Sequence, residues 1–112
     1  MAINKQNSDK YIWANECFGW HLLNSPSLSV IQETMPTGMQ EALHLHHKSQ
    51  QFFFILKGVA TFKVDGKKHT INAGEGIHIV KGQAHQVSNQ SDDELEFLVI
   101  SEPHAHGDRE YK

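Results

Sequence analysis

The amino-acid sequence predicts one all-β domain, a sandwich or a barrel. Short apolar or alternating segments recur at roughly 8–12-residue spacing, which is typical of such folds. Glycine, proline, asparagine and aspartate lie between these segments and favour turns. With 112 residues, the chain has the usual size of a single domain. A domain of this size can bury roughly 65% of its unfolded surface, which is enough for one core.

The predicted strands lie within residues 18–103, between two polar segments. Residues 1–17 combine polar side chains with a few aromatic ones, and we expect an arm or a short helix there. Residues 104–112 follow Pro103 and are expected to form a polar tail. Between them, strands are predicted at 20–23, 28–35, 42–46, 51–56, 59–64, 68–72, 77–80, 85–88 and 95–100.

Turn residues support the order of these strands. A polar turn with Pro26 follows the first strand, and Pro36 and Gly38 interrupt the chain after the second. Residues 59–64 alternate between an apolar and a polar face, and the Asp65-Gly66 pair that follows them predicts a β-hairpin. Glycine-containing turns at 73–76 and 81–82 and a polar loop at 89–94 separate the later strands.

Composition and charge disfavour several classes of protein. The net charge of -3 and the pI near 6.3 give no basic surface for nucleic acid or for an anionic membrane. The N-terminal residues lack the apolar core of a signal peptide, and no apolar run approaches the ~20 residues of a membrane span. Cys17 is the single cysteine, so an internal disulfide cannot form, and we expect a packed side chain in a cytoplasmic protein.

Four side chains have the spacing of a metal site inside a β-barrel. In a strand, His44 and His46 point to the same face, so their imidazoles can converge on one ion. Gln51 opens the next strand after a short connector, and His85 must come from another hairpin that lines the same interior. The alternative is a packed polar interior without metal. Histidine is the commonest metal ligand in proteins, and nine histidines are present.

The residues around these four resemble two motifs of the cupin superfamily. The first motif, G-x5-H-x-H-x3-4-E-x6-G, runs from Gly38 to Gly58, with Gln51 in place of glutamate. The second, G-x5-P-x-G-x2-H-x3-N, runs from Gly74 to Asn89, with Val80 in place of proline. The chain therefore resembles a small single-domain cupin. The resemblance implies a jelly-roll, or double-stranded β-helix, barrel. It also implies a metal ion inside the barrel, held by His44, His46, Gln51 and His85.

The glutamine ligand favours one kind of chemistry over another. Gln51 offers a neutral amide oxygen, so a divalent ion keeps its full charge and acts as a strong Lewis acid. It also lacks the base that cupin dioxygenases resembling quercetinases are thought to use. We therefore expect an isomerase, tautomerase or ring-opening cupin that acts on a sugar, uronate or keto or hydroxy acid, with a metal-dependent dioxygenase as an alternative. Uronate-linearising cupins have a similar ligand set, but they carry an acidic residue where this chain has Leu98 or Val99. The ion is one divalent transition metal: Zn, Ni, Mn, Fe or Cu.

Two residues are candidate catalytic groups. His78 lies in an Ile-His-Ile strand, and it could act as an acid or base if its ring faces inward. Glu41 lies three residues before His44, either as a carboxylate at the rim or as the base. Glu33, in an earlier strand, could face either side of the sheet.

Other polar residues have structural interpretations as well as functional ones. His47 is expected to be a solvated loop residue, or else a partner of a metal ligand. His104 and His106 are attributed to the composition of the polar tail. Asp108 and Arg109 are either solvated or close over the pocket mouth, where arginine could bind a carboxylate with both of its terminal nitrogens.

A run of three phenylalanines predicts an apolar outer surface. If Gln51 faces inward, then Phe53 and Ile55 share its face, and the intervening side chains point outward. Exposed apolar patches of this kind usually have a cover, which would be the partner sheet and N-terminal arm or a second subunit. We expect a homodimer. The outward side chains are Phe52, Phe54 and Leu56.

Three functions remain open from the sequence alone. The first is a metal-dependent enzyme with an open coordination position and a pocket lined by Phe53, Phe62 and His78. The second is a non-catalytic module that binds or senses a small ligand in the same cup. The third is a structural barrel that acts through its outer surface. Whether the protein is an enzyme at all is not decided by the sequence.

Overall fold

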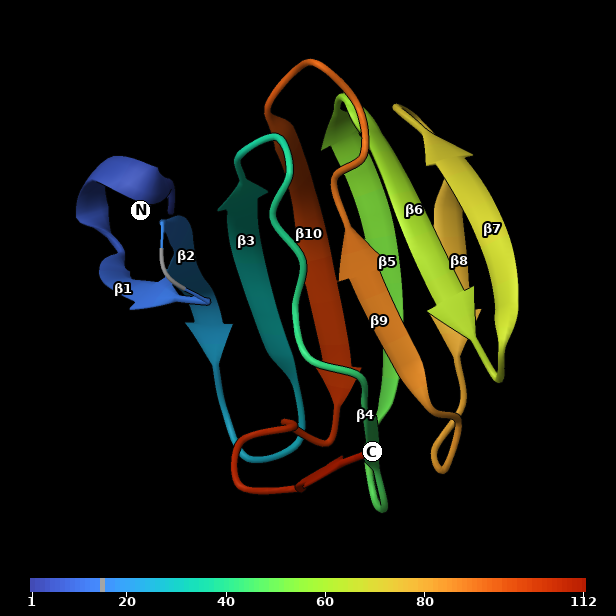
Figure 1. Ribbon diagram of the computed structural model, residues 1–112. Coiled ribbons are helices and arrows are strands. Elements are labelled where there is room, and N and C mark those ends of the chain that lie inside the picture. Colours follow the sequence, from blue (N-terminus) through green and yellow to red (C-terminus); the bar gives the residue numbers. More distant parts are fainter. Residues whose placement is uncertain (15) are drawn as a thin grey trace.

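The computed structural model describes residues 1–14 and 16–112 as two antiparallel β-sheets (Figure 1). One sheet has six strands in the order β1-β2-β3-β10-β5-β8, and the other has five in the order β11-β4-β9-β6-β7. A short 3-10 helix, η1 (Lys5–Asn7), precedes them. The strands are β1 (Asp9–Trp13), β2 (Cys17–Asn24), β3 (Ser29–Met35), β4 (His44–His46), β5 (Gln50–Lys57), β6 (Val59–Val64), β7 (Lys67–Asn72), β8 (Gly76–Ile79), β9 (His85–Ser88), β10 (Leu95–Glu102) and β11 (Arg109–Tyr111).

The hydrophobic core lies between the two sheets. Alternate residues of β5, β6 and β10 point inward, and Phe53, Phe62 and Phe97 pack together there. The ring centroids of Phe53 and Phe62 are 4.9 Å apart, in an edge-to-face arrangement. The remaining core side chains include Met35, Ile55, Ala60, Val64, Ile79, Val87, Leu95 and Val99. The all-β fold class predicted from the sequence is confirmed.

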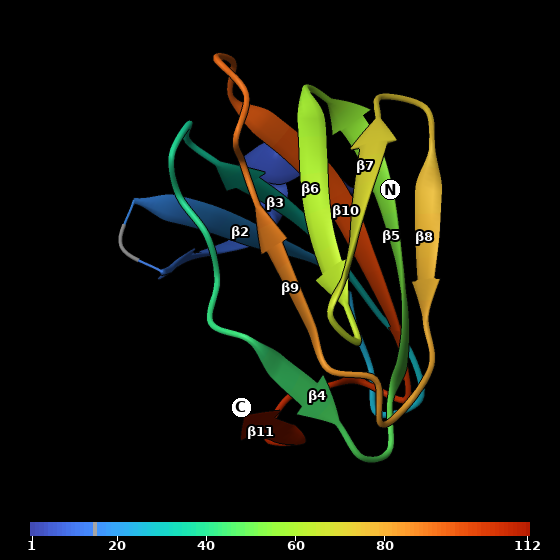
Figure 2. The ribbon, with the colours of Figure 1, turned by 45° about the vertical axis from the view of Figure 1, so that its right-hand side comes forward.

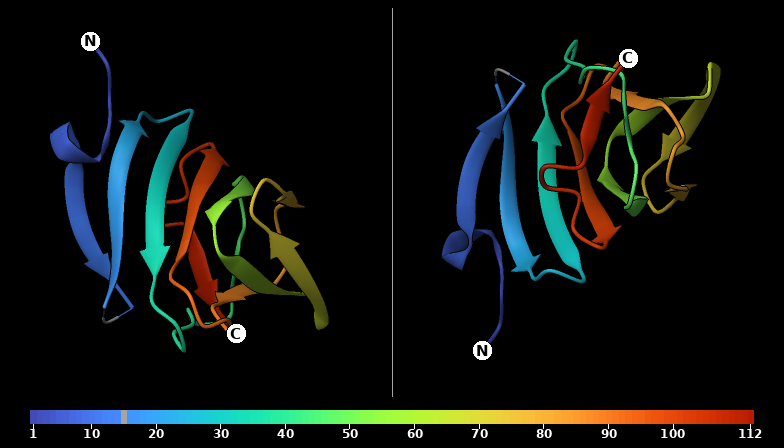
Figure 3. Two further views of the ribbon diagram at one scale, coloured as in Figure 1. Left: turned by 90° about the horizontal axis from the view of Figure 1, so that it is seen from above. Right: turned by 90° about the horizontal axis from the view of Figure 1, so that it is seen from below.

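The predicted strands recur in the structure, and two strands were not predicted. The bounds of β6 and β9 are those expected, and Asp65 and Gly66 form the predicted hairpin turn with positive φ angles of 49° and 83°. The polar terminal segments contribute β1 and β11, which pair with β2 and β4 respectively. Seen from above and below, β1 and β2 extend the six-stranded sheet beyond the region where the sheets face each other (Figure 3).

The two motifs contain residues whose role is to shape the backbone. Gly58 has a φ of +84°, and a Cβ atom there would lie 2.7 Å from the carbonyl oxygen of Glu94, so only glycine fits. Asn89 is buried, and its amide donates to the carbonyl oxygens of Met35 and Asp93 at 2.9 and 2.8 Å. The motif asparagine therefore holds the loop before β10 against the end of β3.

The outer face of the six-stranded sheet carries the apolar side chains that were expected there. Phe52 is 39% exposed and Leu56 42%, whereas Phe53 and Ile55 are buried on the opposite face. Phe54 is half-buried and stacks against Phe52 at 6.5 Å between ring centroids. Among residues 1–14 and 16–112 there is no helix with the length and apolarity needed to cross a bilayer.

Candidate metal centre

The two motifs bring three histidines together between the sheets. His44 and His46 lie on β4, and His44 is paired with His85 of the neighbouring strand β9. One nitrogen from each ring lies within 4.8 Å of the other two. All three side chains are buried, and the nearest rings, those of His44 and His85, have centroids 4.4 Å apart. This cluster is the arrangement expected of a three-histidine metal site.

Main-chain carbonyls orient all three rings in the same way. The Nδ1–H of His44 donates to the carbonyl oxygen of Ala42 at 2.8 Å, and that of His85 donates to Gln83 at 3.0 Å. The Nδ1–H of His46 donates to the carbonyl oxygen of Asp108 at 3.1 Å. A carbonyl oxygen only accepts, so each Nδ1 carries the proton and each Nε2 keeps its lone pair. Such outer partners are characteristic of metal-ligating histidines.

Buried acceptor atoms without hydrogen-bond partners are further evidence for a cation site. Within the part of the chain that the structure describes, the Nε2 atoms of His46 and His85 and the Oε1 of Gln51 are buried and lack a hydrogen-bond partner. The Gln51 amide donates to the Oγ of Ser101 at 3.0 Å, which leaves its oxygen free. Buried acceptors of this kind are costly unless something binds them. Two imidazole nitrogens and one amide oxygen are donors that a divalent transition metal accepts.

The protein holds these rings neutral, as metal binding requires. Burial, together with a smaller effect of the Arg109 charge, lowers the pKa of His44 to about 3 and that of His85 to about 4. Burial also lowers the pKa of His46. Near pH 7 the ring lone pairs are therefore free of protons and available to a cation.

A cavity of about 580 Å³ opens beside the histidine cluster. Its volume is in the range of small-molecule sites, which is about 300–1,000 Å³. His44, Gln51 and Phe53 line it from the metal side, and Arg109 of β11, although exposed, lines it as well. Further walls come from the N-terminal strands and the C-terminal segment: Tyr11, Trp13, His21, Asn24, Ser29, Ile31, Val99, Ser101, His104, Ala105, His106, Gly107 and Tyr111.

Two carboxyl groups also line this cavity. Glu33 accepts a hydrogen bond from the Tyr11 hydroxyl at 2.7 Å, and Glu41 accepts one from the Val87 N–H at 3.1 Å. Burial raises the pKa of Glu33 to about 7, while Tyr11 and Arg109 act to lower it. Burial, together with a smaller effect of the Glu33 charge, raises the pKa of Glu41 to about 8. Carboxyl groups that titrate near neutrality are suited to proton transfer.

His78 lies outside the cavity. Its side chain is exposed on β8, and its Nε2 is 2.8 Å from the Oε1 of Gln50. A catalytic role for His78 required an inward-facing ring, and the structure contradicts this orientation, because β8 turns Ile77 and Ile79 toward the core. His47 is exposed, as expected, and its Nε2 is 2.7 Å from the carboxylate of Glu110. Cys17 is buried, and burial raises the pKa of its thiol to about 11.

Of the two interpretations of Asp108 and Arg109, a solvated tail and a cover of the pocket mouth, the structure agrees with the second for Arg109, which lines the cavity although it is exposed. We call residues 104–111 the C-terminal strap, because this segment leaves β10, passes the turn before β3 and returns beside β4 as β11 (Figure 2). His104 and His106 line the cavity, and the Asp108 carboxylate accepts hydrogen bonds from backbone N–H groups of the turn after β4. Sequence reasoning missed Tyr11 as a cavity residue. The available signal was the aromatic alternation of Tyr11 and Trp13 within a polar segment.

Comparisons with known proteins agree with this architecture. The sequence matches the Cupin domain family over residues 30–101. It is 32% identical to the oxalate-binding protein of Thermotoga maritima over 66 residues, which is 59% of this chain and 54% of that protein. It is 29% identical to an uncharacterized protein of Methanocaldococcus jannaschii over 83 residues, 73% of this chain and 66% of that one. The chain thus spans just under two thirds of the length of one of these relatives and about half that of the other.

Two solved structures share the fold at low sequence identity. A predicted oxalate decarboxylase from Thermotoga maritima has a TM-score of 0.84 and 23% identity, over 93% of this chain and 100% of that chain. KdgF from Halomonas sp. also has a TM-score of 0.84, with 13% identity over 93% and 94% of the two chains. The family match, which includes His44, His46 and His85, agrees with the two-sheet fold. These findings show that the chain belongs to the cupin family.

Proposed function

We propose that this protein binds one divalent transition metal through His44, His46, Gln51 and His85 and uses it as a Lewis acid. The observation that carries the proposal is the set of buried, unpartnered acceptors on His46, Gln51 and His85. A metal held by neutral ligands would polarise a carbonyl or hydroxyl oxygen of a bound substrate. Because the ligands add no negative charge, the ion would favour an anionic or enolate-like oxygen.

The proposed substrate is a small polar molecule with a carboxylate, such as a uronate or a keto or hydroxy acid. Arg109 lines the cavity together with His44, and its guanidinium suits a carboxylate group. Glu41 and Glu33 are the candidates for moving a proton on this substrate, because both line the cavity, Glu41 as a buried and Glu33 as a half-buried side chain. The proposed reaction class is isomerisation, tautomerisation or ring opening.

A second candidate is a module that binds a small carboxylate without turning it over. The relative from Thermotoga maritima, which is named an oxalate-binding protein, favours this function. Metal-loaded protein can be incubated with oxalate, with keto and hydroxy acids and with unsaturated uronates, while NMR follows the ligands. Isomerised or ring-opened product supports the enzyme, whereas saturable binding with unchanged ligand spectra supports the binding module.

The metal assignment is tested by elemental analysis of untagged protein purified without chelator. We expect about one transition-metal ion per chain in the wild type and a loss of most of it in His44→Ala and His85→Ala, since each variant removes one of the four proposed ligands. Circular dichroism should show that both variants stay folded. Stoichiometric metal in both variants would overturn the ligand assignment.

The homodimer stays a proposal, and it is supported by the apolar outer face of the six-stranded sheet. Phe52 and Leu56 are exposed there, next to the half-buried Phe54. A second copy of the chain would remove these side chains from water. Sedimentation of the wild type and of Phe52→Glu would test the idea, since a charge at the centre of such an interface should shift a dimer to monomer.

A further inference from the structure

The three histidines differ in where their orienting carbonyl comes from. Ala42 and Gln83 each lie two residues before the histidine that they orient, within the same local segment. The carbonyl that orients His46 belongs to Asp108, which is 62 residues away in the sequence. The orientation of His46 therefore depends on the C-terminal strap, whereas His44 and His85 are oriented locally.

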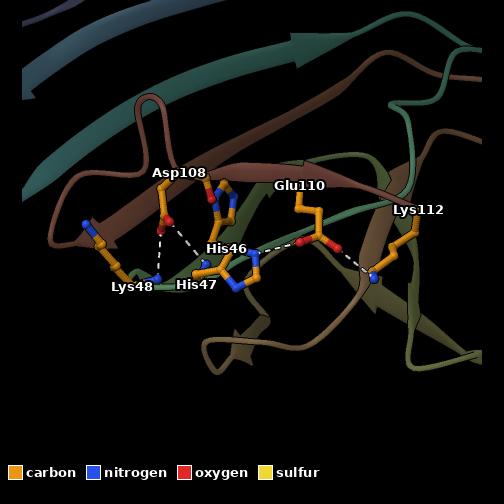
Figure 4. A network of polar contacts seen from close by, with 6 residues as sticks. All are labelled: His46, His47, Lys48, Asp108, Glu110 and Lys112. Carbon is orange, nitrogen blue, oxygen red and sulfur yellow. Dashed lines mark hydrogen bonds and ion pairs between the residues drawn. The ribbon is translucent and has the colours of Figure 1, made fainter.

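One side chain fastens the strap at this point. The carboxylate of Asp108 accepts hydrogen bonds from the backbone N–H groups of His47 and Lys48 at 3.2 and 2.9 Å (Figure 4). It accepts a third from the backbone N–H of Ser49 at 3.0 Å. Three N–H donors converge on this one carboxylate, and hydrogen bonds to a carboxylate are stronger than those to a neutral acceptor.

The same strap forms part of the cavity wall. Gly107 and Arg109, on either side of Asp108, line the cavity, and Arg109 is paired with His46 across β11 and β4. The position of Asp108 thus affects both the metal ligand and the cavity wall. Glu110, two residues further on, bonds the side chains of His47 and Lys112 instead and lies on an exposed network (Figure 4).

We propose that Asp108 is a positioning residue for the metal centre: its carboxylate clamps the turn at residues 47–49 and so holds its own carbonyl against the Nδ1–H of His46. This inference rests on the proposed metal-binding function. It extends that function to a residue outside both cupin motifs, in a segment whose composition resembles a polar tail. A backbone carbonyl cannot be removed by substitution, but the clamp that holds it can.

The experiment measures Zn²⁺ affinity by competition with a chromophoric chelator for the wild type, Asp108→Ala, Asp108→Asn and Glu110→Gln. We expect Asp108→Ala to weaken Zn²⁺ binding about 10- to 100-fold, as is usual for outer partners of ligating histidines. Asp108→Asn should recover part of this loss, because its amide oxygen can still accept two of the three N–H groups. Glu110→Gln, the matched control on the same strap, should bind Zn²⁺ as the wild type does.

A spectroscopic measurement separates a changed orientation of His46 from a general loss of protein stability. In Co²⁺-loaded protein, the visible absorption bands report ligand geometry, and Asp108→Ala should change them while Glu110→Gln does not. If the wild type binds Zn²⁺ and Asp108→Ala binds it equally well, the positioning role is overturned and the proposed function stands. If the wild type binds no Zn²⁺, both are overturned. If Asp108→Ala does not melt cooperatively, the test uses Asp108→Asn instead. A Zn²⁺ affinity and Co²⁺ bands of Asp108→Asn equal to those of the wild type would overturn the positioning role. A weaker affinity and shifted bands would support it.

Discussion

Two groups of titratable side chains line the same region between the sheets, and burial favours the neutral form of both. For the histidines the neutral form is the deprotonated one, and their pKa values fall to about 3 for His44 and about 4 for His85. For the carboxyl groups the neutral form is the protonated one, and their pKa values rise to about 7 for Glu33 and about 8 for Glu41. The histidines are left with free lone pairs, whereas the carboxyl groups already have partners in the protein. A cation should therefore bind among the histidines, and a proton should move at the carboxyl groups.

The largest expected effect is acid destabilisation of the metal-free protein by the histidines. Their folded pKa values lie below the unfolded value of 6.5, so the stability they contribute is present above pH 6.5 and is lost as the pH falls through about 4 to 3. The loss should reach on the order of 3 kcal/mol or more. Chemical denaturation from pH 7 to pH 3.5 would measure it. His85→Gln should flatten this dependence, and an unchanged slope in that variant would contradict the assignment.

A smaller effect of opposite sign is expected from Glu41. Its folded pKa of about 8 lies above the unfolded value of 4.5, so its contribution to stability is present below pH 4.5 and is lost as the pH rises through about 8. Glu41→Gln, which keeps the shape and cannot ionise, should gain on the order of 2 kcal/mol relative to the wild type between pH 5 and pH 9. Thermal melts of both metal-free proteins across this range would measure the difference. A difference that does not vary with pH would show that Glu41 is ionised in the folded state.

Most of the fold was predictable because its signals are local. The segment that became β6 alternates apolar and polar side chains, and Asp65-Gly66 marks the hairpin after it. β1 and β11 carry no such pattern: Asp9–Trp13 begins with two charged residues, and Arg109–Tyr111 is a short polar strand. Their strand conformation comes from pairing with β2 and β4, a tertiary effect that overrides local propensity.

The candidate site also contains some residues that local sequence signals predicted and others that they did not. Side-chain alternation placed His44 and His46 on one face of a strand, and the resemblance to the second cupin motif added His85 to the cluster. The condition of an inward-facing His78 is not met, since spacing alone did not settle which face of β8 is buried. The role of Asp108 depends on hydrogen bonds to residues that lie 59 to 62 positions earlier in the sequence, and no local pattern encodes it. The alternation of Tyr11 and Trp13 is a local signal for a strand, but it does not indicate the hydrogen bond of Tyr11 to Glu33.

The smallest expected effect concerns Gln51, where the two kinds of titratable group can be combined. Replacing Gln51 with glutamate would place an ionisable carboxyl group beside the histidines. The Gln51 amide donates to Ser101, whose hydroxyl could instead donate to a carboxylate, so Gln51→Glu should fold without a lost hydrogen bond. A negative ligand attracts a divalent cation more strongly, and we expect Zn²⁺ affinity to rise at least about tenfold. The matched control is Gln50→Glu, which adds the same charge one residue earlier on the exposed face. Chelator competition should show little change for Gln50→Glu. Equal increases in both variants would indicate a long-range effect of charge and would argue against Gln51 as a ligand.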